Sequence, residues 1–381
     1  MLFDPESHEQ LLDEPWRPAA IEAAIREIVG ETEAVFDDGW PAHPEDEPEP
    51  VRFRSVYAGG AGVIRALDEL QRRGLCELQR DYVPYLEQDY VPDEPEDDHP
   101  PSLLVGETGI RLVLQRLEPS KANADRLAEL IAANANDEHR ELLWGSPGTM
   151  LAAAELHRST GEVRWTELWQ QSAAWLEGEL DPESGVWTQV IRGREAHYLG
   201  PAHGFAGCIL ALTAITPSPE IHEHAAVVAR RYAVEEDGLA NWPALTDIGL
   251  RARDGNIRVQ WCHGAPGMIV SLAGFAADDA EHDRLLQAGG ELTWRAGPLA
   301  KGPGLCHGTA GNGYAFLALL ERTGDELWLE RARAFAMHAA AQVARARNAH
   351  GRGRFTLWTG DPGTALYLAD CLAGHGALPL P

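Results

Sequence analysis

The chain has 381 residues, of which 44% are hydrophobic, and it carries a formal net charge of −27. This charge argues against binding to nucleic acids or to anionic membrane surfaces, and the sequence holds no apolar run of the roughly 18 residues that a membrane-spanning helix needs. Five scattered cysteines and an amino terminus without a basic and apolar leader favour a cytoplasmic protein over a secreted, disulfide-linked one.

Much of the negative charge lies in two segments near the amino terminus. Residues 37–50 form a proline-containing acidic tract, and residues 87–98, EQDYVPDEPEDD, form a second one. We expect both to be solvated loops; the alternative is that they rim a site and repel anions. Residues 1–56 match no repeat, and we expect them to form an outer segment that includes the first acidic loop.

From residue 57 to residue 372 the chain repeats one pattern seven times, a Gly-x-x-Gly followed by an apolar helical run. The copies begin at Gly59, Gly106, Gly145, Gly204, Gly264, Gly308 and Gly360. The runs after the glycines are apolar nearly all round, whereas segments between them, such as residues 325–347, are amphipathic. Buried inner helices should therefore alternate with outer ones. We predict a single all-α domain over residues 1–381, an α/α toroid of seven hairpins with seven inner and seven outer helices.

The amino ends of the inner helices should gather at one face of such a toroid, so that the residues before each glycine line a common site. Copies one, two and seven offer nothing obviously reactive there. The others offer Glu141, Trp144, His203, Cys262, His263, Cys306 and His307. Thiolate and imidazole are ligands that Zn²⁺ prefers, so the two Cys-His-Gly stretches predict one zinc ion. Two cysteines and one histidine would leave an open, catalytic position, whereas both histidines would close a structural site.

Three segments carry a resemblance to a known family. YLGPAHGFAG, QWCHGAPG and KGPGLCHGTAGNGYAFL resemble the signature segments of the lanthionine synthetase C-like family, and they are most similar to its eukaryotic branch. The resemblance implies that Cys262, Cys306 and His307 are the zinc ligands and that His203 is an acid/base group. His263 stands where many cyclases of the family have tyrosine, which argues against a ligand role.

The resemblance also implies further site residues. Arg258 matches an arginine of the lantibiotic cyclases, and Glu141 stands where those cyclases carry an aspartate. Lys301 matches a lysine linked to glutathione binding in the eukaryotic branch, and Arg352 and Arg354 fall near an arginine with the same proposed role. We therefore expect these three cations, together with His263, to bind substrate.

The activity that follows from the resemblance is the addition of a thiol, from glutathione or a peptide cysteine, to dehydroalanine or dehydrobutyrine in a peptide or protein. His203 would protonate the α-carbon and Arg258 would stabilise the enolate. Glu141 would fix the tautomer of His203, hold the substrate, or serve only as a structural cap. The alternatives are a non-catalytic zinc- and glutathione-binding regulatory module and an α/α-toroid glycosidase with paired carboxylates.

Overall fold

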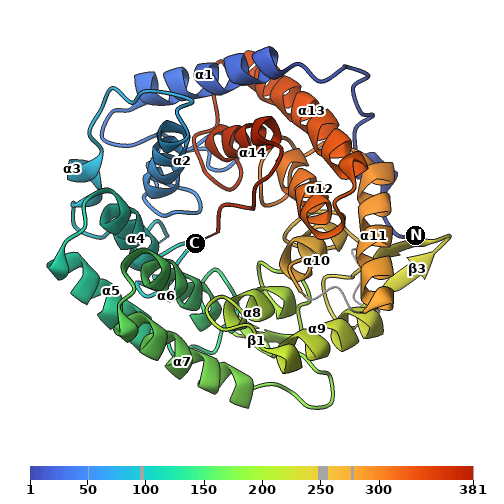
Figure 1. Ribbon diagram of the computed structural model, residues 1–381. Helices are drawn as coiled ribbons and strands as arrows, with labels where there is room; N and C mark the ends of the chain where they lie inside the picture. Colours follow the sequence, from blue (N-terminus) through green and yellow to red (C-terminus); the bar gives the residue numbers. More distant parts are fainter. Residues whose placement is uncertain (50, 95–97, 248–255, 276–278, 381) are drawn as a thin grey trace.

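The computed structural model describes residues 1–49, 51–94, 98–247, 256–275 and 279–380. Within these residues seven helices form an inner ring, seen end-on in Figure 1. They are α2 (Gly60–Arg72), α4 (Glu107–Leu117), α6 (Ser146–Thr160), α8 (Phe205–Leu212), α10 (Ala265–Leu272), α12 (Thr309–Thr323) and α14 (Asp361–Ala373). Each begins directly after the first glycine of one Gly-x-x-Gly copy. The predicted all-α toroid is thereby confirmed.

The outer layer consists of helices that alternate with the inner ones along the chain. They are α1 (Pro18–Val35), α5 (Lys121–Ala133), α7 (Val163–Gly178), α9 (Pro219–Tyr232), α11 (Ala280–Ala296) and α13 (Glu326–His350), with a single-turn helix, α3 (Val83–Leu86), against α4 and a short 3-10 helix at Pro5–Ser7. None of the described helices has both the length and the hydropathy needed to cross a membrane.

Helix α1 comes from the amino-terminal segment that matches no repeat, and it packs against α14 at the other end of the chain. Figure 1 shows α1 outside α14, in the place that an outer helix of the seventh hairpin would take. Its residues Ile21, Ile25 and Ile28 are buried, as a four-then-three spacing on one helix face requires. The amino-terminal segment therefore closes the ring.

The second glycine of each Gly-x-x-Gly lies against the backbone of the loop before it. A Cβ added at Gly207 or Gly311 would overlap the carbonyl oxygen six residues earlier, that of Pro201 or Leu305. The same clash would arise at the second glycine of the other five copies. Only glycine permits so close an approach, so the pattern fixes the height at which each preceding loop sits above its helix.

Two short antiparallel β-hairpins interrupt the helices in the described chain, one of β1 (Gln189–Ile191) with β2 (Arg194–Ala196) and one of β3 (Val234–Glu236) with β4 (Leu239–Asn241). Their turns, Arg192-Gly193 and Asp237-Gly238, have positive φ at both residues, which is the type I′ geometry of two-residue hairpins. The helical periodicity did not predict either hairpin.

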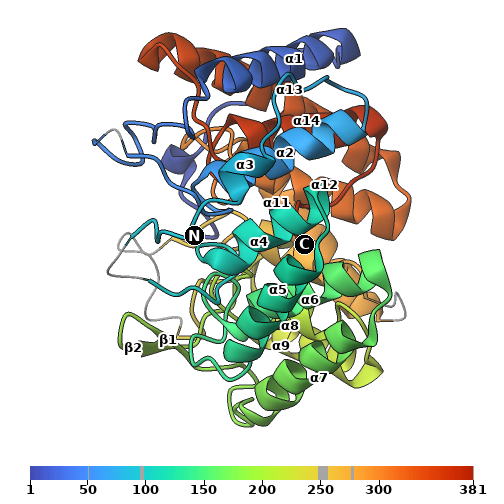
Figure 2. The same cartoon turned by 90° about the vertical axis from the view of Figure 1, so that its left-hand side faces the viewer.

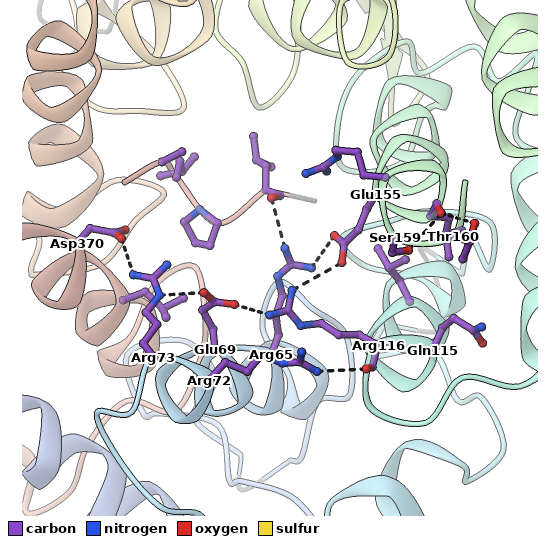
Figure 3. A pocket seen from close by; sticks show the side chains of 18 of the residues that line it. Arg65, Glu69, Arg72, Arg73, Gln115, Arg116, Glu155, Ser159, Thr160 and Asp370 are labelled. Carbon is purple, nitrogen blue, oxygen red and sulfur yellow. Dashed lines mark hydrogen bonds and ion pairs between the residues drawn. The ribbon is translucent and has the colours of Figure 1, made fainter. Parts of the chain in front are cut away.

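The two ends of the ring differ in character. Connecting loops and the β1–β2 hairpin collect on the left-hand side in Figure 2. A cavity of about 620 Å³ lies at the opposite end, among the carboxyl-terminal turns of α2, α4, α6 and α14. Figure 3 shows its arginines paired with carboxylates, including Arg65 with Glu155 and Arg73 with Asp370. Arg65 also donates to the carbonyl of Leu380, which ties the carboxyl-terminal segment to this end.

Candidate metal centre

The two Cys-His-Gly stretches are joined directly through their backbones. Cys262 and Cys306 stand at the same place in consecutive copies, two residues before the first glycine. The N–H of Cys262 donates to the carbonyl of Cys306 at 3.1 Å, and the N–H of Cys306 donates to the carbonyl of Trp358 in the next copy at 2.8 Å. Residues 44 positions apart in the sequence thereby lie on adjacent loops.

These loops bring together the sulfur atoms of Cys262 and Cys306 and one ring nitrogen of His307, all within 4.8 Å of one another. Both cysteines are buried, and both thiols are free of disulfides. Two sulfurs and one imidazole are a donor set that Zn²⁺ takes in tetrahedral sites, with one position left for a further ligand. The residues therefore fit the predicted zinc ion.

The two thiols influence each other's protonation. The hydrogen bond between them, together with burial, raises the pKa of Cys262, and the same hydrogen bond lowers the pKa of Cys306. A hydrogen bond with His307 lowers the pKa of Cys306 further against the opposing effect of burial. The cluster thus favours one thiolate even before a metal ion is considered, and a thiolate is the form that binds metals.

Two side chains that the sequence analysis did not select support the sulfurs. Tyr57 is hydrogen-bonded to the sulfur of Cys306 and stacks on Trp358, and the amide of Gln260 donates to the sulfur of Cys262 at 2.9 Å. The first copy, in which we expected nothing obviously reactive, therefore contributes a supporting side chain to the group. Tyr57 stands two residues before Gly59, just as each cysteine stands two residues before the first glycine of its copy. This shared position in the repeat could have identified Tyr57 from the sequence.

His203 and Glu141 form a pair beside this cluster. Nδ1 of His203 is 2.9 Å from Oε2 of Glu141, whose side chain is fully buried. Burial lowers the pKa of His203, but the hydrogen bond and the charge of Glu141 outweigh it, so that this pKa is raised. The other oxygen of Glu141 accepts from the N–H groups of Trp144, at 2.6 Å, and Gly145, at 3.3 Å. Glu141 thus both orients His203 and caps α6.

His263 and Arg258 lie close to the centre without belonging to the three-ligand group. The ring centroid of His263 is 6.0 Å from those of His203 and Tyr198. Its Nδ1 is buried and has no hydrogen-bond partner among the described residues. Burial lowers the pKa of His263 to about 3, and neighbouring positive charges add to the effect. Arg258 is exposed. The hydrogen bond with Cys306 and burial raise the pKa of Cys262, and the charge of Arg258 only partly opposes that rise.

A cavity of about 370 Å³ opens beside the centre, lined by Tyr57, Trp144 and His203. The two acidic segments contribute Asp46, Glu47, Asp93 and Glu94 to its wall. Most acidic side chains of both segments are exposed, as expected of solvated loops, and both segments also rim this cavity, as in the alternative. Residue 50 and residues 95–97 of these segments lie outside the described residues.

The three expected substrate-binding cations, Lys301, Arg352 and Arg354, line a neighbouring cavity of about 260 Å³ that shares Thr359 with the first. Arg354 pairs with Asp46, and Arg352 donates to the carbonyl of Ala42. The two arginines therefore hold the first acidic segment against the seventh copy. Lys301 is exposed at the cavity edge.

Several known proteins resemble this chain, among them two relatives that match part of it. Glutathione S-transferase LANCL1 of Danio rerio is 41% identical over 128 residues, 32% of this chain and 30% of that protein. LanC-like protein GCL1 of Arabidopsis thaliana is 32% identical over 212 residues, 52% of this chain and 46% of that protein. The chain thus spans less than half the length of these curated relatives.

The fold itself is shared with the solved structure of a cyclase. The solved structure of nisin cyclase superposes with a TM-score of 0.58 at 15% identity, covering 93% of this chain and 99% of that one. At that identity the likeness concerns the fold alone. The family model of the lanthionine synthetase C-like proteins matches residues 50–378, which include all seven inner helices and every residue of the centre described above. The chain belongs to the lanthionine synthetase C-like family.

Proposed function

We propose that this protein is a zinc-dependent enzyme that adds a thiol to dehydroalanine or dehydrobutyrine in a peptide or protein and so forms a thioether. The observation that carries the proposal is the position of the Cys262–Cys306–His307 group beside the His203–Glu141 pair, next to one cavity. Family membership and the names of the relatives, a glutathione S-transferase and a cyclase, agree with this chemistry.

Cys262, Cys306 and His307 would hold the zinc ion. When bound, the ion would act as a Lewis acid and lower the pKa of a substrate thiol. The pKa of a free cysteine thiol is about 8.5. Tyr57 and Gln260 hold the sulfurs of the two cysteines in place through their hydrogen bonds. A ligand set oriented in this way needs little rearrangement on binding.

His203 is the group that would handle the proton. Its Nδ1 is engaged by Glu141, which leaves Nε2 for the cavity that the ring lines. In the reaction the thiol loses its proton to solvent and its sulfur bonds to the β-carbon. The double bond's electrons move onto the α-carbon and its carbonyl, and a proton is then added to the α-carbon. The raised pKa of His203 favours the protonated ring, which is the form that a proton donor requires. Arg258 would stabilise the enolate oxygen.

Glutathione is one candidate thiol and a peptide cysteine is the other. Lys301 and the neighbouring arginine-containing cavity could receive the carboxylates of glutathione, since charge-assisted hydrogen bonds to carboxylates are strong. A glycosidase is less well supported, because two of the four carboxylates in the cavity wall are already engaged. Asp46 binds Arg354, and Asp93 accepts from the backbone N–H groups of Arg54 and Ser55.

The test is incubation of the purified protein with glutathione and a dehydroalanine peptide, followed by mass spectrometry and by metal analysis of the protein. We expect one zinc per chain and a thioether adduct. Cys306→Ala should lose both the metal and the adduct, whereas His203→Ala should keep the metal and lose the adduct. Exposed His375 provides a matched control, because His375→Ala should retain both. Glutathione binding without any adduct would favour the regulatory module, and absence of metal would refute the proposal.

A further inference from the structure

A second group of metal-ligating side chains lies outside the centre described above. His99 belongs to the loop before α4, and Asp137 and His139 belong to the connection between α5 and α6. Nε2 of His99 is 3.3 Å from Oδ2 of Asp137, and Nδ1 of His139 is 2.7 Å from Oδ1 of the same carboxylate. Potential ligand atoms of all three residues lie within 4.8 Å of one another.

We propose that His99, Asp137 and His139 form a second binding site, for a divalent transition-metal ion such as Zn²⁺ or Co²⁺. Two imidazoles and one carboxylate are a donor set that such ions accept. Ligand atoms about 2.1 Å from a tetrahedral ion lie roughly 3.4 Å from each other. The 3.3 Å between His99 and Asp137 is close to that spacing, whereas His139 and Asp137 are 2.7 Å apart and would separate slightly around an ion. All three residues are partly exposed, so an ion can enter from solvent and keep water as a further ligand.

A fourth oxygen is oriented toward the same place. Oδ1 of the buried Asn134 lies 2.9 Å from Nε2 of His99, and its Nδ2 donates to the carbonyl of Trp144 at 3.0 Å. The hydrogen bond to Trp144 fixes which way the amide faces and therefore presents its oxygen to His99. Burial lowers the pKa of His139, but the hydrogen bond and charge of Asp137 outweigh it and raise that pKa, so a proton competes with a metal ion for this ring.

Trp144 connects the proposed second metal site with the cavity beside the Cys262–Cys306–His307 group. The ring of Trp144 stacks on that of His139, with centroids 5.8 Å apart, and on that of His203, with centroids 5.9 Å apart. An ion bound to His139 would therefore restrain the ring of Trp144, which lines the cavity of about 370 Å³ together with His203. The proposal does not depend on the thioether-forming activity, since its residues are separate from the Cys262–Cys306–His307 group.

The experiment is a Co²⁺ titration of the zinc-containing protein, followed by visible absorption and by calorimetry. We expect a further equivalent of Co²⁺ with weak d–d bands and without the intense sulfur-to-metal charge transfer that thiolate ligands give, and we expect Zn²⁺ to displace it. Binding should strengthen as the pH rises, because the ion competes with protons for imidazole. Cys306→Ala should leave this equivalent in place.

Variants of the second group should remove that equivalent selectively. His139→Ala should abolish it and Asp137→Asn should weaken it at least tenfold, with His375→Ala as the unaffected control. Each variant must keep its first zinc equivalent and its near-ultraviolet circular dichroism, which shows that it has folded. Failure of millimolar Co²⁺ to bind, or binding unchanged in the double variant His99→Gln/His139→Gln, would overturn the proposal.

Discussion

At the scale of single residues, the carboxylate of Glu141 divides its two oxygens between two tasks. One oxygen accepts from backbone N–H groups at the start of α6, and the other accepts from His203. The negative charge next to His203 is what raises its pKa against the effect of burial. A carboxylate in this place holds the imidazole with its proton on Nδ1 when the ring is neutral, so that Nε2 is the atom that exchanges protons with substrate.

Glu141→Gln tests this arrangement. Glutamine can still cap α6, but it lacks the charge, so we expect the pKa of His203 to fall and thioether formation to slow roughly 100-fold. A raised native pKa contributes stability that is complete below the ordinary value of about 6.5 and disappears as the pH rises through the native value. The variant should therefore lose more stability under acidic than alkaline conditions.

NMR titration of the histidine ring and urea unfolding at several pH values measure these two effects. Glu138→Gln, a change in the same loop, is the control and should leave the pKa of His203 unchanged. An unchanged pKa of His203 in Glu141→Gln would show that the carboxylate does not set it.

The residues of the metal centre differ in how far the sequence reveals them. Cys262, Cys306 and His307 stand in twin stretches, and thiols are rare enough in this chain for the repetition to be informative. Tyr57 shares their register, but a lone tyrosine before a glycine carries no chemical signature by itself. His99 and His139 are brought together by the path of two loops, which helical periodicity does not describe.

At the scale of elements, the Gly-x-x-Gly pattern sets where each inner helix starts. The second glycine allows the first turn of the inner helix to contact the carbonyl oxygen six residues earlier. This contact gives the loop before each inner helix the same position relative to its helix. The inner helices could be predicted because this steric requirement is written into every copy. The hairpins could not be predicted from periodicity, although Asp237-Gly238 is a two-residue turn signal, because strands of three residues are too short to show alternation.

Gly311→Ala tests the steric requirement. Its new Cβ would overlap the carbonyl oxygen of Leu305, next to Cys306, so we expect a loss of about 1–3 kcal/mol in the free energy of unfolding. Gly30→Ala in the middle of α1 is the matched control, because a Cβ there meets nothing within 4 Å. That change should stabilise the protein by about 0.5–1 kcal/mol, as alanine does in a helix. Urea unfolding of both variants supplies the comparison, and equal effects would contradict the packing argument.

At the scale of the whole molecule, the ring unites parts of the chain that are far apart in sequence. The proposed zinc ligands belong to the fifth and sixth copies, the supporting Tyr57 to the first, and the proposed proton donor His203 to the fourth. Tyr57 can meet Cys306 only if the first and last copies close on each other, and α1 covers α14 at that junction. The repeats predict a ring, but they do not reveal α1 as its closing helix, since its sequence lacks the glycine pattern.

Ile25→Ala tests whether closure and metal binding are coupled. Ile25 is 1% exposed within the face that α1 buries, and its truncation should cost about 2–5 kcal/mol. If the ring unfolds as one unit, zinc release, followed with a chromogenic chelator, should coincide with the loss of helical circular dichroism, and both should shift to lower urea concentration by the same amount. Val227→Ala on the outer helix α9 is the control, since Val227 is 48% exposed, and its effect should stay within about 0.5 kcal/mol. Metal retained after the helical signal is lost would show that the centre does not depend on closure of the ring.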